Sequence, residues 1–175
     1  MNGAGSQDLT IQLVRSQSSI DATTKLIWEF FDHLRERYSE RRDDIDAYIE
    51  NQDISGQIAA FSTRLGPPAG ECLLGLVKED PMGIVMLKRV DEDLCEMNRL
   101  YVRDAARGLG LGRRLVERLL SEAKSQGYTR MRLDAWDRHE EALPLYESCG
   151  FEYYSEPGKL AEILESKPVQ MRRSL

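Results

Sequence analysis

Residues 102–115 read Val-Arg-Asp-Ala-Ala-Arg-Gly-Leu-Gly-Leu-Gly-Arg-Arg-Leu. They join the end of an apolar strand to a turn with three alternate glycines, Gly108, Gly110 and Gly112, and then to an amphipathic helix. The first N–H groups of a helix have no partner inside it and carry the positive end of its dipole, and glycines let a ligand approach them closely. We therefore expect a phosphate-binding site at this turn.

The charge around the turn is opposite in sign to that of the whole chain. The 175 residues carry 24 Lys and Arg against 30 Asp and Glu, a net charge of −6. This balance argues against nucleic acid and an anionic membrane as partners, so an anionic ligand would need a local basic segment. Between positions 103 and 118 the net charge is +3, from five arginines and two acids: Arg103, Arg107, Arg113, Arg114 and Arg118 against Asp104 and Glu117.

Two well-known phosphate loops do not fit the turn. The dinucleotide-binding pattern G-x-G-x-x-G needs a third glycine where this chain has Arg113 or Leu115. The nucleoside triphosphate loop ends in Gly-Lys-Ser/Thr, but Gly112 is followed by two arginines. The remaining alternative without a ligand is a turn that only packs a helix against a sheet.

Hydrophobic patterning predicts a single α/β domain over residues 9–175, after a flexible N-terminus at 1–8. The predicted strands are Leu9–Val14, Cys72–Val77, Gly83–Leu87, Leu94–Val102, Met131–Trp136, Phe151–Tyr154 and Val169–Leu175. The predicted helices are Asp21–Tyr38, Asp43–Glu50, Ile58–Phe61, a helix from Leu111 that stops at Gly127, and Glu140–Ser148. A long loop is expected over Ser155–Lys167, with a helical turn at Leu160–Leu164. Turns at Lys78–Met82 and Asp91–Asp93 make an antiparallel meander, and the later strand-helix-strand order implies a parallel crossover, so the fold class is a mixed central sheet flanked by helices.

Composition also bears on the compartment and on metal chemistry. No apolar run approaches the roughly 18 residues that span a bilayer, and the first eight residues lack the features of a secretory signal, so we expect a cytoplasmic protein. Cys72, Cys95 and Cys149 are odd in number and far apart, which favours reduced core residues over disulfides or a zinc site. His33 and His139 lie more than a hundred positions apart, so no metal centre is expected.

The stretch Arg107–Gly112 matches the pattern (Q/R)-x-x-G-x-(G/A) and resembles the acetyl-CoA diphosphate loop of the GNAT N-acetyltransferases. Cys95–Val102 resembles the fourth strand of that family, and Asp134 closes what resembles its fifth. Ala142–Phe151 is similar to the family signature A-x-x-L-Y-x-x-x-G-F. The order and spacing of these segments imply a GNAT fold, and the resemblance covers roughly half of the chain.

By position, the resemblance implies that backbone N–H groups at the turn bind the diphosphate of acetyl-CoA, the cosubstrate, without a metal. In the family, the fourth strand bulges near the positions of Leu100 and Val102, and an N–H there polarises the acetyl carbonyl. His139 stands where the family often has an Asn that binds pantetheine, and a neutral imidazole can also donate or accept a hydrogen bond. The implied cofactor-binding residues are Leu100, Tyr101, Val102, Arg107, Gly108, Leu109, Gly110, Leu111, Gly112, Arg113, His139 and Tyr146.

Two residues are candidates for catalysis. A lysine-like amine has a reference pKa of about 10.4, so a base must take its proton at neutral pH. Glu96 resembles the glutamate that part of the family uses for this, directly or through water, and the alternative is a surface glutamate beside a strand. Tyr146 would donate a proton to the departing CoA thiolate, unless its ring only packs near Phe151. Cys149 has no evident histidine partner, so an acyl-cysteine intermediate is not expected.

The resemblance thus implies an enzyme that moves acetyl from acetyl-CoA to the primary amine of a small molecule, peptide or protein, by direct attack in a ternary complex. A CoA-binding regulator or sensor without turnover is the alternative, and it would need neither Glu96 nor Tyr146. The second helix has an acidic face that could attract a cationic amine or simply be solvated, formed by Asp43, Asp44, Asp46 and Glu50. Trp28, Phe30 and Phe31 are expected in the core. The acceptor amine and the oligomeric state, monomer or homodimer, stay open.

Overall fold

The computed structural model describes residues 8–136, 138–154 and 169–175. Its strands are β1 (Leu9–Leu13), β2 (Gly70–Val77), β3 (Asp80–Arg89), β4 (Leu94–Val102), β5 (Arg130–Ala135), β6 (Glu152–Tyr153) and β7 (Val169–Ser174). Its α-helices are α1 (Gln17–Arg37), α2 (Arg42–Asn51), α3 (Ile54–Ala59), α4 (Phe61–Arg64), α5 (Leu111–Ser125) and α6 (Leu143–Ser148). Three short 3-10 turns are η1 (Ser39–Arg41), η2 (Asp104–Ala106) and η3 (Glu140–Ala142). None of the helices described is both long and apolar enough to cross a membrane.

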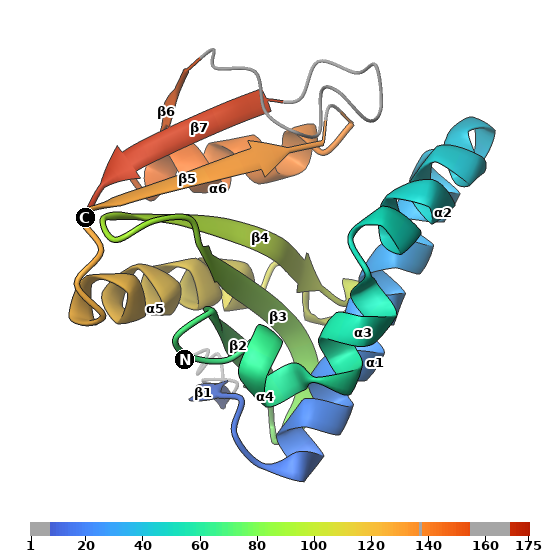
Figure 1. The fold of residues 1–175 in the computed structure, drawn as a ribbon, viewed down its shortest axis with the longest axis horizontal. Helices are drawn as coiled ribbons and strands as arrows, with labels where there is room; N and C mark the ends of the chain where they lie inside the picture. Colours follow the sequence, from blue (N-terminus) through green and yellow to red (C-terminus); the bar gives the residue numbers. More distant parts are fainter. Residues whose placement is uncertain (1–7, 137, 155–168) are drawn as a thin grey trace, which may run out of the picture.

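The strands form one sheet in the order β1-β2-β3-β4-β5-β7-β6 (Figure 1). All neighbours pair antiparallel except β4 and β5, which are parallel. The chain passes from β4 to β5 through α5, as the strand-helix-strand order predicts. The predicted mixed sheet, an antiparallel meander followed by a parallel crossover, is confirmed.

Both faces of β2 and β3 are buried, which explains why these strands are continuous apolar runs instead of alternating ones. Leu74 and Ile84 belong to the core cluster that includes α1 and α2. Leu73 and Val85 belong to a second cluster, with α5, α6 and the far strands. The sheet therefore separates two hydrophobic cores.

Several boundaries differ from those predicted. α1 begins at Gln17 instead of Asp21, because Ser16 caps the helix by accepting a hydrogen bond at its Oγ from the Ser19 N–H, at 3.2 Å. The turn between β2 and β3 is only Lys78 and Glu79, both at positive φ (49° and 71°), as tight hairpins require.

The predicted helical segment Ile58–Phe61 is divided between α3 and α4. The loop expected over Ser155–Lys167, with its helical turn at Leu160–Leu164, lies outside the described residues, as do residues 1–7 of the expected N-terminus. The carbonyl of Asp8 accepts a hydrogen bond from the Lys78 N–H at 2.9 Å, so the described chain is anchored from its first residue.

β4 contains a bulge in its second half. Met86 of β3 pairs with Asn98, but Ile84 pairs with Tyr101, so β4 has one extra residue between these pairs. Within this bulge, Arg99 has a φ of 51°, in the left-handed region. A bulge redirects the side chains that follow it, and here it changes the alternation of β4.

β4 and β5 diverge from the bulge onward (Figure 1). They pair only from Leu94 to Met97 on β4, so the backbone of residues 98–102 has no strand partner on the β5 side. The bulge expected near Leu100 and Val102 is therefore present and adjoins an opening in the sheet.

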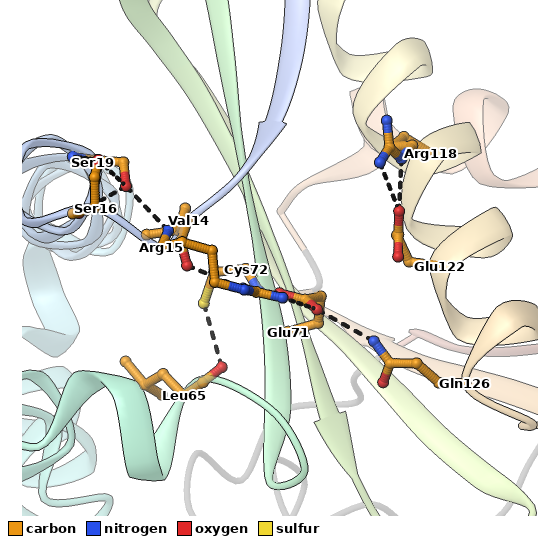
Figure 2. Close-up of polar contacts among 10 residues, drawn as sticks. All are labelled: Val14, Arg15, Ser16, Ser19, Leu65, Glu71, Cys72, Arg118, Glu122 and Gln126. Atoms are coloured by element: carbon orange, nitrogen blue, oxygen red, sulfur yellow. Dashed lines mark hydrogen bonds and ion pairs between the residues drawn. The ribbon is translucent and has the colours of Figure 1, made fainter.

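An ion pair with a buried carboxylate links α1, β2 and α5 (Figure 2). Glu71 on β2 is 1% exposed, and both its carboxylate oxygens accept hydrogen bonds from the Arg15 guanidinium at 2.8 Å. Gln126, at the end of α5, donates to the same carboxylate at 3.2 Å, and the Cys72 N–H donates at 3.0 Å. Arg15 precedes α1, so this carboxylate connects α1, β2 and α5.

Candidate active site

The turn before α5 presents a row of backbone donors. Gly108 and Gly110 have φ values of 76° and 85°, which favour glycine, and a Cβ on either would meet no atom within 4 Å. Gly110 is the N-cap of α5 and no side chain caps the helix. Within the described part of the chain, the N–H groups of residues 108–113 donate no hydrogen bond. An anion can therefore approach these groups through open space.

Two of the five arginines near the turn frame it. Arg107 donates from Nε to the carbonyl of Val102 at 3.2 Å, and Arg113 donates to Ser148 Oγ of α6 at 2.7 Å. The turn lies against α6 and the end of β4, because a Cβ on Gly112 would be 3.6 Å from Leu145 Cδ2 and 3.8 Å from Val102 Cγ2.

The other three arginines are engaged elsewhere. Arg103 forms two hydrogen bonds with Glu29 of α1 at 2.8 and 2.6 Å. Arg114 binds the Leu9 carbonyl, and Arg118 pairs with Glu122. The net local charge of +3 counted along the sequence therefore overstates the charge available to a ligand.

A cavity of about 950 Å³ lies where β4 and β5 diverge. Its walls come from α1, α2, α3, α4 and α6 and from the facing parts of β3, β4, β5 and β7. Four of the predicted site residues line it: Glu96, Leu100, His139 and Tyr146. Tyr101, Val102 and the turn at 107–113 do not line it. The turn lies against Leu145 of α6, and the next residue of that helix, Tyr146, lines the cavity.

Tyr146 is buried, 8% exposed, with its ring edge-on to Phe151 at 6.1 Å between centroids. Burial raises the pKa of its phenol well above the ordinary value of 10. The hydroxyl therefore keeps its proton at neutral pH. The ring packs in the core and the residue also lines the cavity, so packing does not separate Tyr146 from a ligand there. Its role in the reaction stays a prediction.

Glu96 lines the cavity and is paired with Arg132 of β5, whose Nε donates to Oε2 at 3.0 Å. The pair bridges β4 and β5 next to the point where their pairing ends. A solvated surface glutamate is therefore not the right description of Glu96. One of its oxygens is engaged by Arg132, and the other is left for a ligand or a water.

His139 has an unsatisfied polar atom. Its Nε2 is buried and has no hydrogen-bond partner in the part of the chain that the structure describes. Burial, reinforced by the charge of Arg37, lowers the pKa of the imidazole to about 4, so the ring is neutral at pH 7. A buried polar atom without a partner costs about 1–3 kcal/mol, and a ligand that bonds to it recovers this energy.

The two histidines are neighbours in space, although they are far apart in sequence. The ring centroids of His33 and His139 are 6.1 Å apart. Sequence separation was therefore a poor argument against a shared site. Among residues 8–136, 138–154 and 169–175, however, no three or more His, Cys, Asp or Glu side chains are placed to hold a metal ion.

The acidic face of α2 does not line the cavity. Asp46 pairs with Arg35, and Asp44 pairs with Arg41, on the outer surface. The residues that α2 and its C-cap contribute to the cavity are Tyr48, Asn51 and Gln52. The structure therefore agrees with the interpretation of Asp43, Asp44, Asp46 and Glu50 as a solvated face.

The aromatic and cysteine predictions have different outcomes. Phe30 and Phe31 are in the core as expected, but they also line the cavity. Trp28 is partly buried against the same core. All three cysteines are buried and unpaired, and burial raises the pKa of Cys149, which keeps its thiol protonated and unreactive.

Several cavity residues were missed in the sequence, among them Arg99, Arg132, Asn98 and Gln57. Arg99 was interpreted only as part of a strand. One signal could have marked it: Asn98 and Arg99 are consecutive polar residues in a strand that otherwise alternates, which is typical of a bulge. Nothing comparable singles out Gln57, since its place depends on the packing of α3.

Comparison with known proteins agrees with this geometry. The model of the acetyltransferase (GNAT) family matches residues 22–151. An N-acetyltransferase of Schizosaccharomyces pombe is 35% identical over 119 residues, which is 61% of this chain and 69% of that protein. The fold matches an acetyltransferase from Streptococcus agalactiae with a TM-score of 0.74 at 19% identity, over 97% and 99% of the two chains. It also matches PaiA N-acetyltransferase from Thermoplasma acidophilum, solved in complex with coenzyme A, with a TM-score of 0.69 at 15% identity, over 96% and 99%.

Proposed function

Because the chain belongs to the acetyltransferase (GNAT) family, we propose that it transfers the acetyl group of acetyl-CoA to the primary amine of a small molecule, peptide or protein, in a ternary complex. The observation that carries this proposal is the row of unpaired N–H groups at residues 108–113 beside a cavity that Glu96 and Tyr146 line. Acetyl-CoA supplies an activated thioester carbon for the amine to attack.

The turn at 108–113 holds the diphosphate through its N–H groups, with Arg107 and Arg113 on either side. The pantetheine arm occupies the gap between β4 and β5. Its amides form hydrogen bonds with His139 Nε2 and with the unpaired backbone of β4. An N–H at the bulge, near Leu100, donates to the carbonyl oxygen as it becomes an oxyanion.

An acceptor amine that is protonated at neutral pH must lose two protons, one before its nitrogen can attack and one as the amide forms, and one of the two passes to solvent. Its nitrogen forms a bond to the carbonyl carbon, the carbon–sulfur bond breaks, and the electron pair leaves on sulfur as a thiolate. Glu96 takes the proton from the nitrogen, directly or through a water, at the oxygen that Arg132 does not engage.

Tyr146 stabilises the departing thiolate. Its raised pKa opposes full proton transfer to the thiolate, whose conjugate thiol has a pKa near the cysteine reference of about 8.5. A hydrogen bond from the phenol to sulfur is the better description, and it differs from the proton donation expected from the sequence. The proton that finally neutralises the thiolate comes from the amine, by way of Glu96 and solvent.

A panel of amines tests the proposal. Purified protein is incubated with acetyl-CoA and each amine, free thiol release is followed, and the melting temperature is measured with and without acetyl-CoA. We expect stabilisation by about 2.7 kcal/mol at 100 times the dissociation constant, and thiol release that depends on the amine. Stabilisation without thiol release on any amine would instead favour a CoA-binding regulator or sensor.

A further inference from the structure

Arg99 occupies an unusual position in the cavity wall. It lies in the bulge of β4, with a left-handed φ of 51° that a non-glycine residue adopts only at some cost. The bulge directs its side chain toward the core cluster of α1 and α3, because the guanidinium contacts Phe31 and Gln57. Arg99 also lines the cavity and is partly exposed there.

The contacts of Arg99 fix the orientation of its guanidinium but use only some of its N–H donors. Nη2 donates to Gln57 Oε1 at 3.1 Å, Nη1 donates to Met86 Sδ at 3.6 Å, and the group lies 5.7 Å from the centre of the Phe31 ring. A guanidinium has five N–H donors, so these two bonds leave three for a ligand. The contacts fix its orientation, which lowers the entropy lost on binding.

No carboxylate is paired with Arg99 among the described residues. The other cavity arginines with ion pairs are Arg132, which has Glu96, and Arg64, which has Asp53. Burial lowers the pKa of Arg99, and the ionisable groups that act on it are Tyr48 and Cys72, which are neutral at pH 7. A buried charge without a counter-ion is costly, and a bound anion removes that cost.

The phosphates of the coenzyme do not serve as the counter-ion of Arg99. The turn that offers them backbone donors lies at the α6 side, and none of residues 107–113 lines the cavity that Arg99 borders. Charge on the cavity wall is positive, in contrast to the net −6 of the chain: Arg64, Lys88, Arg89, Arg99 and Arg132 against Glu96 and Asp134.

We propose that the acceptor is a small amine that also carries a carboxylate, and that Arg99 binds this carboxylate through its free N–H donors. This inference rests on the proposed acetyl transfer. A planar guanidinium matches a carboxylate with two parallel hydrogen bonds, a geometry that lysine lacks. Glu96 lies on the same strand, three positions before Arg99, so the carboxylate and the amine of one compact molecule can reach Arg99 and the proposed base together.

The test compares free amino acids and ω-aminocarboxylates with their carboxamides, in which the amine is kept and the negative charge is removed. We expect the wild type to prefer the carboxylate member of the best pair, through a lower KM. Arg99→Gln should raise KM for that carboxylate by about 10- to 100-fold and leave KM for its carboxamide and for acetyl-CoA within about twofold, as loss of a charged hydrogen bond predicts. Arg99→Lys should restore part of the loss.

Arg118→Gln is the matched control, since Arg118 pairs with Glu122 on the surface of α5 and does not line the cavity. It should behave as the wild type with every acceptor. A purely structural role for Arg99 would raise KM equally for carboxylates and carboxamides and lower the melting temperature of Arg99→Gln and Arg99→Lys. Either that result or equal wild-type use of the two members of every pair would overturn the carboxylate site.

The two proposals fail in distinguishable ways. Thiol release on carboxamides with no preference for carboxylates overturns the Arg99 site and leaves acetyl transfer standing. The absence of thiol release on any amine overturns acetyl transfer. In that case, calorimetric binding of an aminocarboxylate in the presence of CoA, lost in Arg99→Gln, would still support the site, and no such binding would overturn it as well.

Discussion

Tyr146 and His139 line the same cavity, and burial acts on both toward the neutral form. It raises the pKa of the phenol and lowers that of the imidazole, because each charged form loses its hydration. At pH 7 the phenol is a hydrogen-bond donor, and the imidazole offers one donor and one acceptor. Neither residue therefore needs a counter-ion, and both can form hydrogen bonds with a ligand in the cavity.

Replacement of Tyr146 by Phe should lower kcat by about 100-fold, the usual cost of losing one hydrogen bond to a developing charge. The ring still packs against Phe151, so the dissociation constant of acetyl-CoA should change less than twofold. Stopped-time assays of thiol release and calorimetry measure the two quantities. Tyr153→Phe is the control, because Tyr153 is 54% exposed. An unchanged kcat in Tyr146→Phe would remove this residue from the reaction.

Replacement of His139 by Asn should flatten the dependence of stability on pH. Below pH 6.5 the unfolded chain protonates this histidine, whereas the folded chain does so only near pH 4, so acid favours unfolding across that window. The contribution lost by pH 4 is up to about 3 kcal/mol, from about 1.4 kcal/mol per pKa unit. Urea unfolding of wild type and His139→Asn at several pH values measures it. Parallel curves for the two proteins would show that the imidazole titrates normally.

The sequence predicts which kinds of side chain are candidates for the site, but not which of them contact one another in the fold. Tyr146 lies on α6, within the helix predicted at Glu140–Ser148, because a helical pattern is local in the sequence. The proximity of His33 to His139, the pairing of Glu96 with Arg132 and the isolation of Arg99 all depend on tertiary packing. No spacing rule contains that information.

Among the elements, α5 has a glycine at each end, but the two ends have different surroundings. Gly110 and Gly127 both have positive φ, 85° and 93°, and a Cβ on either would meet no atom within 4 Å. The N-terminal glycine adjoins unpaired N–H groups and the cavity side of α6. The C-terminal glycine only ends the helix.

Gly110→Ala and Gly127→Ala should therefore cost similar stability, about 1 kcal/mol each, but only Gly110→Ala should weaken acetyl-CoA binding, by 10-fold or more. The added methyl group would occupy the space through which the diphosphate approaches. Chemical unfolding and calorimetry separate the two effects. Equal affinities in the two variants would remove the turn from the binding site.

Helices and strands were largely predictable from periodicity, and β4 agrees with its predicted bounds of Leu94–Val102. The predictions were wrong at the ends of helices and strands and where a strand is irregular. The hairpin turn was expected to be longer because Asp80 and Pro81 are turn-forming residues, yet both lie in β3 after a tight turn. The bulge of β4 was implied only by family resemblance, since no propensity rule requires it.

At the scale of the whole molecule, the sheet separates two cores, and Glu71 is a buried charge that links elements from both (Figure 2). Arg15 supplies its counter-charge from the segment before α1, and Gln126 reaches it from the end of α5. The sequence shows this carboxylate only as one polar residue at the start of an apolar strand.

Arg15→Met should destabilise the protein by about 2–3 kcal/mol, because it leaves the Glu71 carboxylate without its ion pair. The expected cost is below that of fully buried pairs, since the Arg15 side chain is 48% exposed. Arg118→Met is the control: it breaks the surface pair with Glu122 and should cost less than about 0.5 kcal/mol. Thermal or urea unfolding measures both, and equal costs would contradict the structural role given to Glu71.

The most direct measurement of the central claim is a crystal structure of the protein with coenzyme A. We predict that the diphosphate oxygens lie about 2.7–3.2 Å from backbone nitrogens of residues 108–113, and that the pantetheine arm enters between β4 and β5 toward Tyr146. A complex with coenzyme A bound elsewhere, and with these N–H groups facing solvent, would contradict the account.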